Sequence, residues 1–215
     1  ATTASFSVDF LLGAEEGKGI TAVGQTDGDE AVEFNYSFQI DLSTSFTGED
    51  SLDISIDAGN GGARLTQLDL NDFGTDDALG VDGISYTFPL GDKVTIMVGN
   101  DVAGSSLYST ACVYGGPTKN LDDCGNNSSA MDASEATAMS ASFDIGNGFA
   151  AAIGYEGEGD NTDGLMTTQG TDTYGGQLSY SADSYAASVT YATYDTPSTD
   201  TTYCLLYTSP SPRDS

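Results

Sequence analysis

The sequence predicts an all-β protein, specifically a transmembrane antiparallel up-and-down β-barrel. Three observations predict this fold. Apolar and polar residues alternate with a period of two over many short segments, and short and long connections alternate between those segments. No run approaches the roughly 20 consecutive apolar residues that a membrane-spanning helix needs. In a barrel wall, lipid-facing and lumen-facing residues alternate along each strand, so the average hydropathy stays near neutral.

The clearest strand covers residues 32–43. Its apolar positions, Val32, Phe34, Tyr36, Phe38, Ile40 and Leu42, alternate without exception with Glu33, Asn35, Ser37, Gln39, Asp41 and Ser43. A helix could not place those apolar residues on one face, whereas a strand does so automatically. A tilted strand of roughly 9–11 residues spans a bilayer, so the run also has a suitable length.

The same alternation predicts further strands along the chain, at residues 6–12, 52–58, 84–88, 94–98, 139–145, 149–155, 174–180 and 185–191. We expect about ten strands here, of roughly sixteen in the complete barrel, within the range of such proteins. Tyrosines cluster near the strand ends, as an aromatic girdle at a membrane interface would require; ordinary strand preference for tyrosine is the alternative. They are Tyr155, Tyr174, Tyr180, Tyr185, Tyr191 and Tyr194.

The connections alternate strictly in length. Short turns are expected at residues 47–50, 89–92, 146–148 and 181–184, and long polar stretches at 13–30, 59–83, 100–137 and 157–171. Outer-membrane barrels have tight periplasmic turns and long external loops. Soluble sandwiches have Greek-key connections without this regularity. The pattern therefore favours a barrel in the cell outer membrane.

The charge balance narrows the function classes. The chain has 33 acidic and 5 basic residues, a formal net charge of −28 and no histidine. Such a surface repels phosphate backbones, so we expect no nucleic-acid partner. The absence of histidine removes the commonest general base and transition-metal ligand, and nothing singles out a catalytic carboxylate pair. We expect no enzymatic activity, no catalytic residues and no cofactor.

Residues 204–215, which begin Cys-Leu-Leu-Tyr-Thr-Ser-Pro, differ in character from the rest of the chain. They resemble the in-frame translation of a transposase-type sequencing adapter; the alternative is a disordered Pro/Ser tail. Residues 1–9 lack both the charged and the apolar region of a secretory signal. The start is therefore interpreted as a mature or a truncated terminus, and residues 1–203 as a partial barrel that is truncated at its C-terminal end.

Cys112 and Cys124 enclose a stretch rich in Gly, Asp and Asn. In an exported protein this arrangement predicts a disulfide. A structural zinc site is the weaker interpretation, because two thiols without further ligands are too few.

Two longer motifs carry a resemblance to a known family. The first runs from Ile40 to Leu52 through Ser45-Phe46-Thr47-Gly48 and is followed by Asp57-Ala58-Gly59-Asn60; the second is Tyr86-Thr87-Phe88-Pro89-Leu90-Gly91-Asp92-Lys93. Both resemble the cyanobacterial iron-uptake porins, also described as OprB-type carbohydrate-selective porins. A third and weaker match is Ser140-Ala141-Ser142-Phe143 leading to Gly154-Tyr155.

The resemblance implies an outer-membrane pore for small solutes or inorganic ions, with iron as one candidate, and a homotrimer as in many porins. Members of the family usually carry an N-terminal surface-layer-homology segment and a coiled coil, and neither is in this sequence. The resemblance therefore implies that the partial barrel of residues 1–203 is truncated at both ends. Their strands often direct Arg or Lys toward the lumen. Basic residues are nearly missing here, which speaks against carbohydrate or anion selectivity.

If Val32 and its apolar partners face lipid, the alternating residues line the pore, namely Glu33, Gln39, Asp41, Asp53 and Asp57. Carboxylates in a pore lower the energy of cations, so we expect a cation preference. The alternative is that these residues merely hydrate a wide channel.

The stretch 100–137 is the candidate constriction loop; a purely external loop is equally compatible with its sequence. Acidic clusters at 27–30 and 160–163 offer oxygen ligands for loosely bound calcium, but neither matches a full calcium-loop pattern. We expect no tight metal site.

The leading hypothesis is thus a passive porin whose partners are outer-membrane lipid and small solutes or inorganic cations. The alternative is a secreted, acidic, β-rich surface or adhesion protein with loosely bound calcium. A halophilic soluble enzyme is a third reading, which rests on the acidic excess alone.

Overall fold

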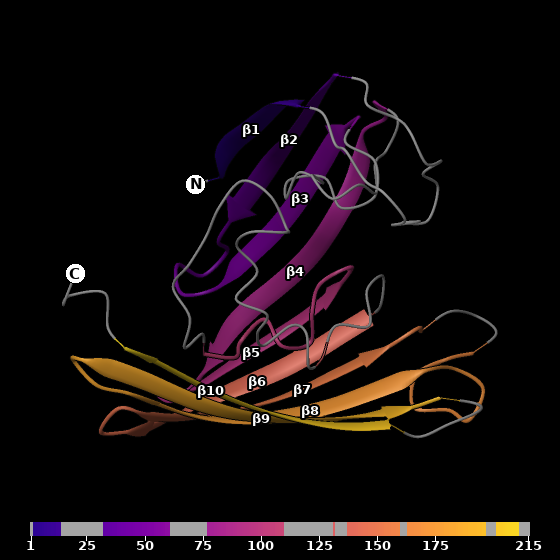
Figure 1. Cartoon of the computed structure of the whole chain (residues 1–215). Helices are drawn as coiled ribbons and strands as arrows, with labels where there is room; N and C mark the ends of the chain where they lie inside the picture. The colour runs from indigo at the N-terminus through magenta and orange to yellow at the C-terminus, as the bar shows by residue number, and fades with distance from the viewer. Residues whose placement is uncertain are drawn as a thin grey trace.

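A computed structural model describes residues 2–13, 32–60, 77–109, 131, 137–159, 163–196 and 201–210. These residues form one ten-stranded antiparallel sheet in which every strand pairs with its neighbours in the sequence (Figure 1). No helix among them is long and apolar enough to cross a membrane. The strands are β1 (Thr3–Gly13), β2 (Glu33–Thr44), β3 (Ser51–Gly59), β4 (Gly80–Leu90), β5 (Val94–Asn100), β6 (Thr137–Gly146), β7 (Phe149–Gly157), β8 (Asp172–Ser181), β9 (Tyr185–Asp195) and β10 (Thr201–Pro210).

This topology confirms the prediction of an all-β, antiparallel, up-and-down fold. Eight of the nine segments with period-two alternation lie inside an observed strand, and the ninth, residues 32–43, begins one residue before β2. The observed strands extend beyond the alternating residues, most clearly β4, which begins at Gly80 and not at Ile84. About ten strands were expected, but no alternating segment marked the position of the last one, β10, which pairs with β9 from Thr201 to Pro210. The origin of residues 204–215 stays a prediction.

Three of the four short turns contain residues that accept left-handed backbone conformations. In the β6–β7 hairpin, Asn147 and Gly148 have φ angles of 56° and 83°. Two consecutive positive φ angles are what a two-residue hairpin loop matched to strand twist requires, and Asn-Gly is the preferred pair. Gly48 and Gly91 serve the β2–β3 and β4–β5 turns, with φ angles of 94° and 72°.

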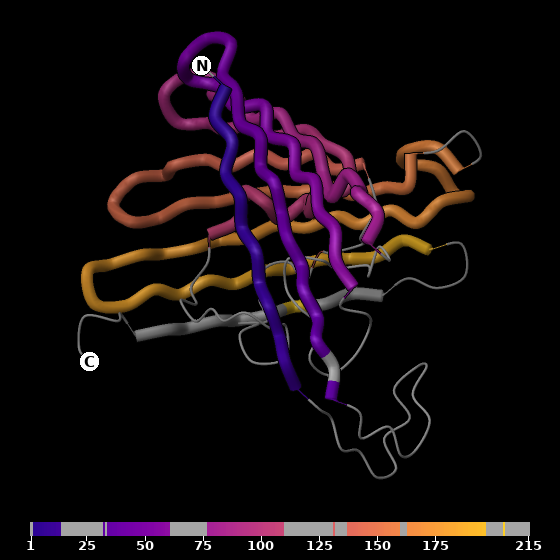
Figure 2. The backbone as a smooth tube through the Cα atoms, turned by 90° about the horizontal axis from the view of Figure 1, so that it is seen from above, coloured from indigo at the N-terminus to yellow at the C-terminus, as the bar shows by residue number. Residues whose placement is uncertain are grey.

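The sheet is strongly curved. Strands β1 to β4 rise out of the plane of β5 to β10 (Figure 1), and seen from above β1 to β3 cross the direction of the later strands steeply (Figure 2). Two irregularities in register lie between Ser55 and Ile56 opposite β4, and between Asp144 and Gly146 in β6. Such bulges bend a strand and increase its twist. The result is a trough with a concave inner face and a convex outer face.

A small packed cluster lies on the inner face. Tyr108 and Met131, from the β5–β6 connection, pack against Ala152 of β7 and Ala192 of β9, and Tyr194 covers the cluster. The main packing of the described residues is thus between sheet and connection, and not between two sheets.

Candidate functional site

The two faces of the sheet have opposite chemistry. Across all ten strands the register places apolar residues opposite apolar residues on the outer face, as with Phe38 and Ala58 or Leu178 and Val189. Polar residues meet on the inner face, as with Gln39 and Asp57. Period-two alternation, maintained strand by strand, therefore produces one apolar and one polar surface.

The exposure of these faces is the reverse of that in a soluble sheet. On the outer face Phe6 is 74% exposed and Ile153 66% exposed, whereas on the inner face Ser37 and Thr190 are 0% and 1% exposed. A contiguous exposed apolar surface of this kind marks contact with a membrane or with another protein. The inner face is the covered, polar side.

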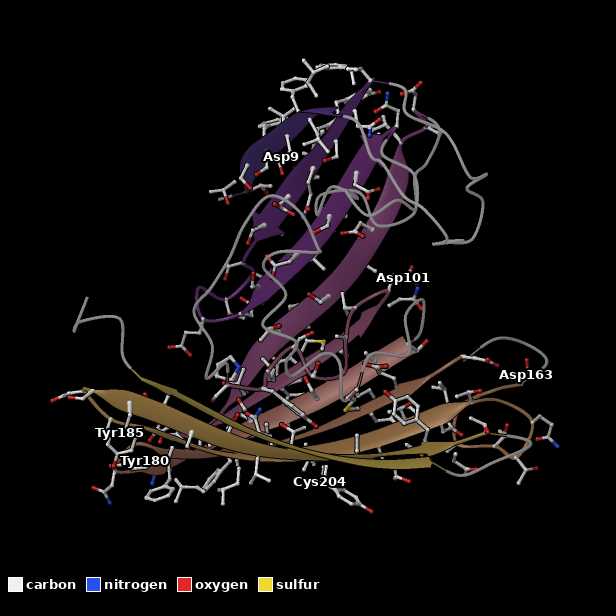
Figure 3. The ribbon with its side chains drawn as sticks, in the orientation of Figure 1. Asp9, Asp101, Asp163, Tyr180, Tyr185 and Cys204 are labelled. Atoms are coloured by element: carbon white, nitrogen blue, oxygen red, sulfur yellow. The ribbon has the colours of Figure 1, made fainter. Side chains whose placement is uncertain are left out.

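Aromatic residues form bands at both ends of the outer face. At the short-turn end Phe149 contacts Tyr180, with ring centroids 4.6 Å apart, and Tyr180 contacts Tyr185 at 5.7 Å; Figure 3 shows both tyrosines on the convex side. At the long-loop end Tyr155 contacts Tyr174 at 5.3 Å. These are the positions at which barrels carry aromatic girdles.

Two of the predicted girdle tyrosines do not fit the bands. Tyr194 lies on the inner face, packed against Tyr108 and Met131, so the prediction is wrong for this residue. Tyr191 lies on the outer face, opposite Gly176 in the middle of β8. The two tyrosines are three positions apart and must face opposite sides of a strand, which the sequence alone could have shown.

The inner face of β1 to β3 carries a hydrogen-bonded acidic network centred on Asp41. Its carboxylate accepts hydrogen bonds from Gln39 Nε2 at 2.7 Å, Ser55 Oγ at 2.8 Å and Ser5 Oγ at 3.3 Å. Asp57 is opposite Gln39 in the register and is 4% exposed. Three strands thus contribute to one polar surface.

The structure places four of the five predicted pore-lining residues on this inner face. Gln39 and Asp41 belong to the network, Asp57 lies opposite Gln39 in the register, and Asp53 accepts a hydrogen bond from Ser51 Oγ at 2.8 Å. The backbone of Glu33 pairs with Gly13 at a position of the same parity, while its side chain lies outside the described residues. Their role in a pore stays a prediction.

Sequence reasoning missed two further acidic residues on the inner side. Asp82 is the extra residue of the β4 bulge and interacts electrostatically with Asp57, Asp41 and Asp101. Strict alternation would place Asp82 on the outer face with Ile84, and the bulge re-aims it. Glu156 is 1% exposed on the inner face; its alternation with Tyr155 was the available signal.

The described part of the β5–β6 connection, residues 101–109, lies against the inner face. Gly104 N donates a hydrogen bond to Glu156 Oε1 at 2.5 Å, and Ser109 N donates one to Gln177 Oε1 at 2.7 Å. Both acceptors are buried, with Glu156 1% and Gln177 5% exposed. Residues 101–109 therefore fold toward the inner face of the sheet.

The wall beneath this segment consists of very small residues. A Cβ added at Gly83 would lie 2.5 Å from the Asp101 carbonyl oxygen, and one at Gly99 would lie 2.5 Å from Val102 Cγ2. Added carbons at Gly154 and Gly175 would collide with Gly104 and Met131. The absence of side chains at these glycines therefore leaves the space that the segment occupies.

A cavity of about 280 Å³ separates Leu107 and Ser109 from the short-turn ends of β5 to β8. Its lining includes Thr95, Ser142, Gln177 and Ser179, with Lys93 at the β4–β5 turn. Lys93 is the one basic side chain in the part of the chain that the structure describes. Open, polar-lined space thus remains beside the inward segment.

The predicted disulfide partners, Cys112 and Cys124, lie outside the described residues, as do residues 27–30 and 160–162 of the acidic clusters. Within the described ranges, no group of three or more acidic or cysteine side chains could hold a metal ion. Cys204 is a free, exposed cysteine and lies on the convex outer face (Figure 3).

An exposed apolar outer face, aromatic bands at both ends and a covered polar inner face are features that walls of β-barrels of the outer-membrane type have in common. Solved structures similar to the chain include variants of one porin.

Three substituted variants of the Rh. blastica porin have TM-scores of 0.49, 0.49 and 0.48 and sequence identities of 14%, 15% and 14% to the chain. In each comparison the match covers 90% of this chain and 63% of the porin chain, so the chain spans less than two thirds of the porins' length. No family model and no curated protein matches the sequence.

Proposed function

We propose that the chain forms part of the wall of an outer-membrane porin. Small solutes or inorganic cations diffuse passively through the pore of this protein, without catalytic turnover. The observation that carries the proposal is the reversed distribution of polarity. Large apolar side chains are exposed on the outer face while polar side chains are covered on the inner face. In a membrane barrel, lipid contacts the apolar outer face, and the water of the lumen hydrates the polar inner face.

The same observation disfavours the alternative of a secreted surface protein. A soluble β-sandwich buries its apolar face against a second sheet. The described residues all belong to one sheet or its connections, and Phe10, Leu12 and Phe34 are each more than half exposed. An adhesion protein with this surface would associate in water.

The charges of the inner face support a cation preference. Asp57, Asp41 and Asp101 each act electrostatically on Asp82, and in the described ranges Lys93 is the single basic residue. Carboxylates in a passage attract cations and repel anions. Iron ions fall within this class, whereas passage of carbohydrate would depend on size alone.

Assembly as a homotrimer in the outer membrane is part of the proposal. It rests on the resemblance to porins noted from the sequence. Chemical crosslinking in detergent should yield a trimer band, and a monomer at all crosslinker concentrations would remove this part while leaving the passage intact.

Ion conductance in a planar bilayer under a salt gradient tests the function. We expect stepwise conductance with a reversal potential that favours cations. The double variant Asp41→Asn, Asp57→Asn should shift that potential toward zero, because both carboxylates lie on the inner face, while Asp183→Asn, at an exposed position in the β8–β9 turn, serves as the control. A protein that stays monomeric without detergent and forms no channels would contradict the proposal.

A further inference from the structure

We infer that Glu156 and Gln177 are positioning residues that hold residues 103–109 against the wall and thereby set the width of the passage. The effect on the width of the passage rests on the proposed function, whereas the attachment of the segment to the wall does not. The segment is attached to the sheet at two points by backbone N–H groups, from Gly104 and Ser109. The acceptors come from different strands, β7 and β8.

The two anchors are placed where water competes least. Glu156 and Gln177 are 1% and 5% exposed, and a buried acceptor that loses its donor pays the full cost of desolvation. Glu156 also acts electrostatically on Tyr108, whose hydroxyl donates a hydrogen bond to Met131 Sδ at 3.3 Å. Gln177 is fixed in turn, because its Nε2 donates to Thr190 Oγ1 at 3.1 Å.

Between the anchors, the segment itself fits tightly. A Cβ added at Gly104 would lie 2.8 Å from Glu156 Cγ, Met131 Cε and the Tyr155 carbonyl oxygen. Ser105 is 5% exposed, whereas its neighbour Ser106 is exposed. A segment that lifts from the wall would therefore uncover Ser105 and leave the environment of Ser106 almost unchanged.

This difference gives a direct readout of the position of the segment. In a background in which Cys112, Cys124 and Cys204 are replaced by serine, Ser105→Cys is reacted with a water-soluble maleimide in the reconstituted protein. Adding Glu156→Ala should raise the labelling rate roughly tenfold or more, as expected for a lost hydrogen bond to a charged acceptor. Gln177→Ala should raise it roughly two- to tenfold.

Three controls separate positioning from general damage. Glu156→Gln keeps an acceptor oxygen at the same length and should restore slow labelling. Glu158→Ala removes an exposed carboxylate two residues away and should change nothing. Ser106→Cys should label at one rate in every background, with far-UV circular dichroism showing that each variant keeps its sheet.

The channel measurement follows on the same variants. Glu156→Ala with Gln177→Ala should increase single-channel conductance and admit larger sugars in vesicle-swelling assays, relative to Glu158→Ala. Unchanged labelling of Ser105→Cys in both alanine variants would overturn the inference. Absence of channels in every variant, including the parent, would instead contradict the proposed function, while the labelling result still decides the positioning role.

Discussion

Asp50 shows how one carboxylate can organise a turn. Its Oδ1 accepts hydrogen bonds from Ser45 Oγ at 2.6 Å, Phe46 N at 3.0 Å, and Thr47 N and Oγ1 both at 2.7 Å, while Oδ2 accepts one from Tyr86 OH at 2.6 Å. These bonds close the β2–β3 turn and tie it to β4. The hydrogen bond from Ser45, followed by those from Tyr86 and Thr47, holds the pKa of Asp50 well below its ordinary value.

The lowered pKa of Asp50 predicts a pH dependence of stability. Because the folded state favours the carboxylate, this group stabilises the fold at pH values above its unfolded pKa of about 4. The contribution is lost as the pH falls below that value toward the lower folded-state pKa. Asp50→Asn should lower the urea midpoint at pH 7, and the difference from the parent should shrink by pH 3.

Urea unfolding followed by far-UV circular dichroism at pH 7, 5 and 3 measures this effect. Asp92→Asn, in the β4–β5 turn, is the matched control and should leave the midpoints unchanged. An Asp50→Asn deficit that stays constant across the three pH values would contradict the account.

Single residues also show which parts of the candidate site could be predicted from the sequence. The alternation placed Gln39, Asp41, Asp53 and Asp57 on one face, as observed, because parity is a property of the strand itself. Asp82 escaped prediction because a bulge shifts the register at one point. The anchoring role of Glu156 also escaped prediction, because its partner Gly104 belongs to a connection whose path the alternation does not specify.

At the scale of the element, the strands and the short turns could be predicted from the sequence. Every short turn expected from Gly, Asn, Pro and Asp residues coincides with a connection between observed strands, and three of the four overlap the last one or two residues of the preceding strand. Local backbone preferences decide such turns. The inward path of residues 101–109 depends instead on small wall residues from four strands, among them Gly83 and Gly175. Those residues meet only after the sheet has formed.

The β6–β7 hairpin provides a test of turn chemistry. Gly148 has a φ angle of 83°, and a Cβ there would collide with the carbonyl oxygen of Ser181. Gly148→Ala should therefore lower the free energy of unfolding by roughly 1–2 kcal/mol or more, as for a non-glycine residue in the left-handed region. Gly13→Ala, where an added Cβ meets nothing within 4 Å, is the control.

The measurement is again the urea midpoint in detergent or lipid. If Gly148→Ala and Gly13→Ala unfold at the same concentration, the left-handed turn does not limit the stability of the hairpin.

At the scale of the whole molecule, acidity is the dominant property. The net charge of −28 creates a field that draws cations toward any aqueous passage. That field is screened over about 10 Å at 0.1 M salt and about 3 Å at 1 M. The cation preference should consequently weaken as salt rises.

Reversal potentials measured at a fixed concentration ratio, first near 0.1 M and then near 1 M, check this prediction. We expect a clear decrease in selectivity at high salt. A selectivity that does not change with salt would indicate ions held by close contacts, and not by the summed charge of the wall.

The glycine-lined wall under residues 101–109 also has a consequence for how the protein can change over time. Lipid is a fluid without shape, so the outer face can exchange one apolar side chain for another of different size with little effect. The inner face at Gly83, Gly99, Gly154 and Gly175 has no such freedom, because each position is already filled by the segment above it. We therefore expect two rates of amino-acid substitution within one strand. Residues that face the membrane should be replaced quickly, and the residues between them, which face the water, should be replaced slowly.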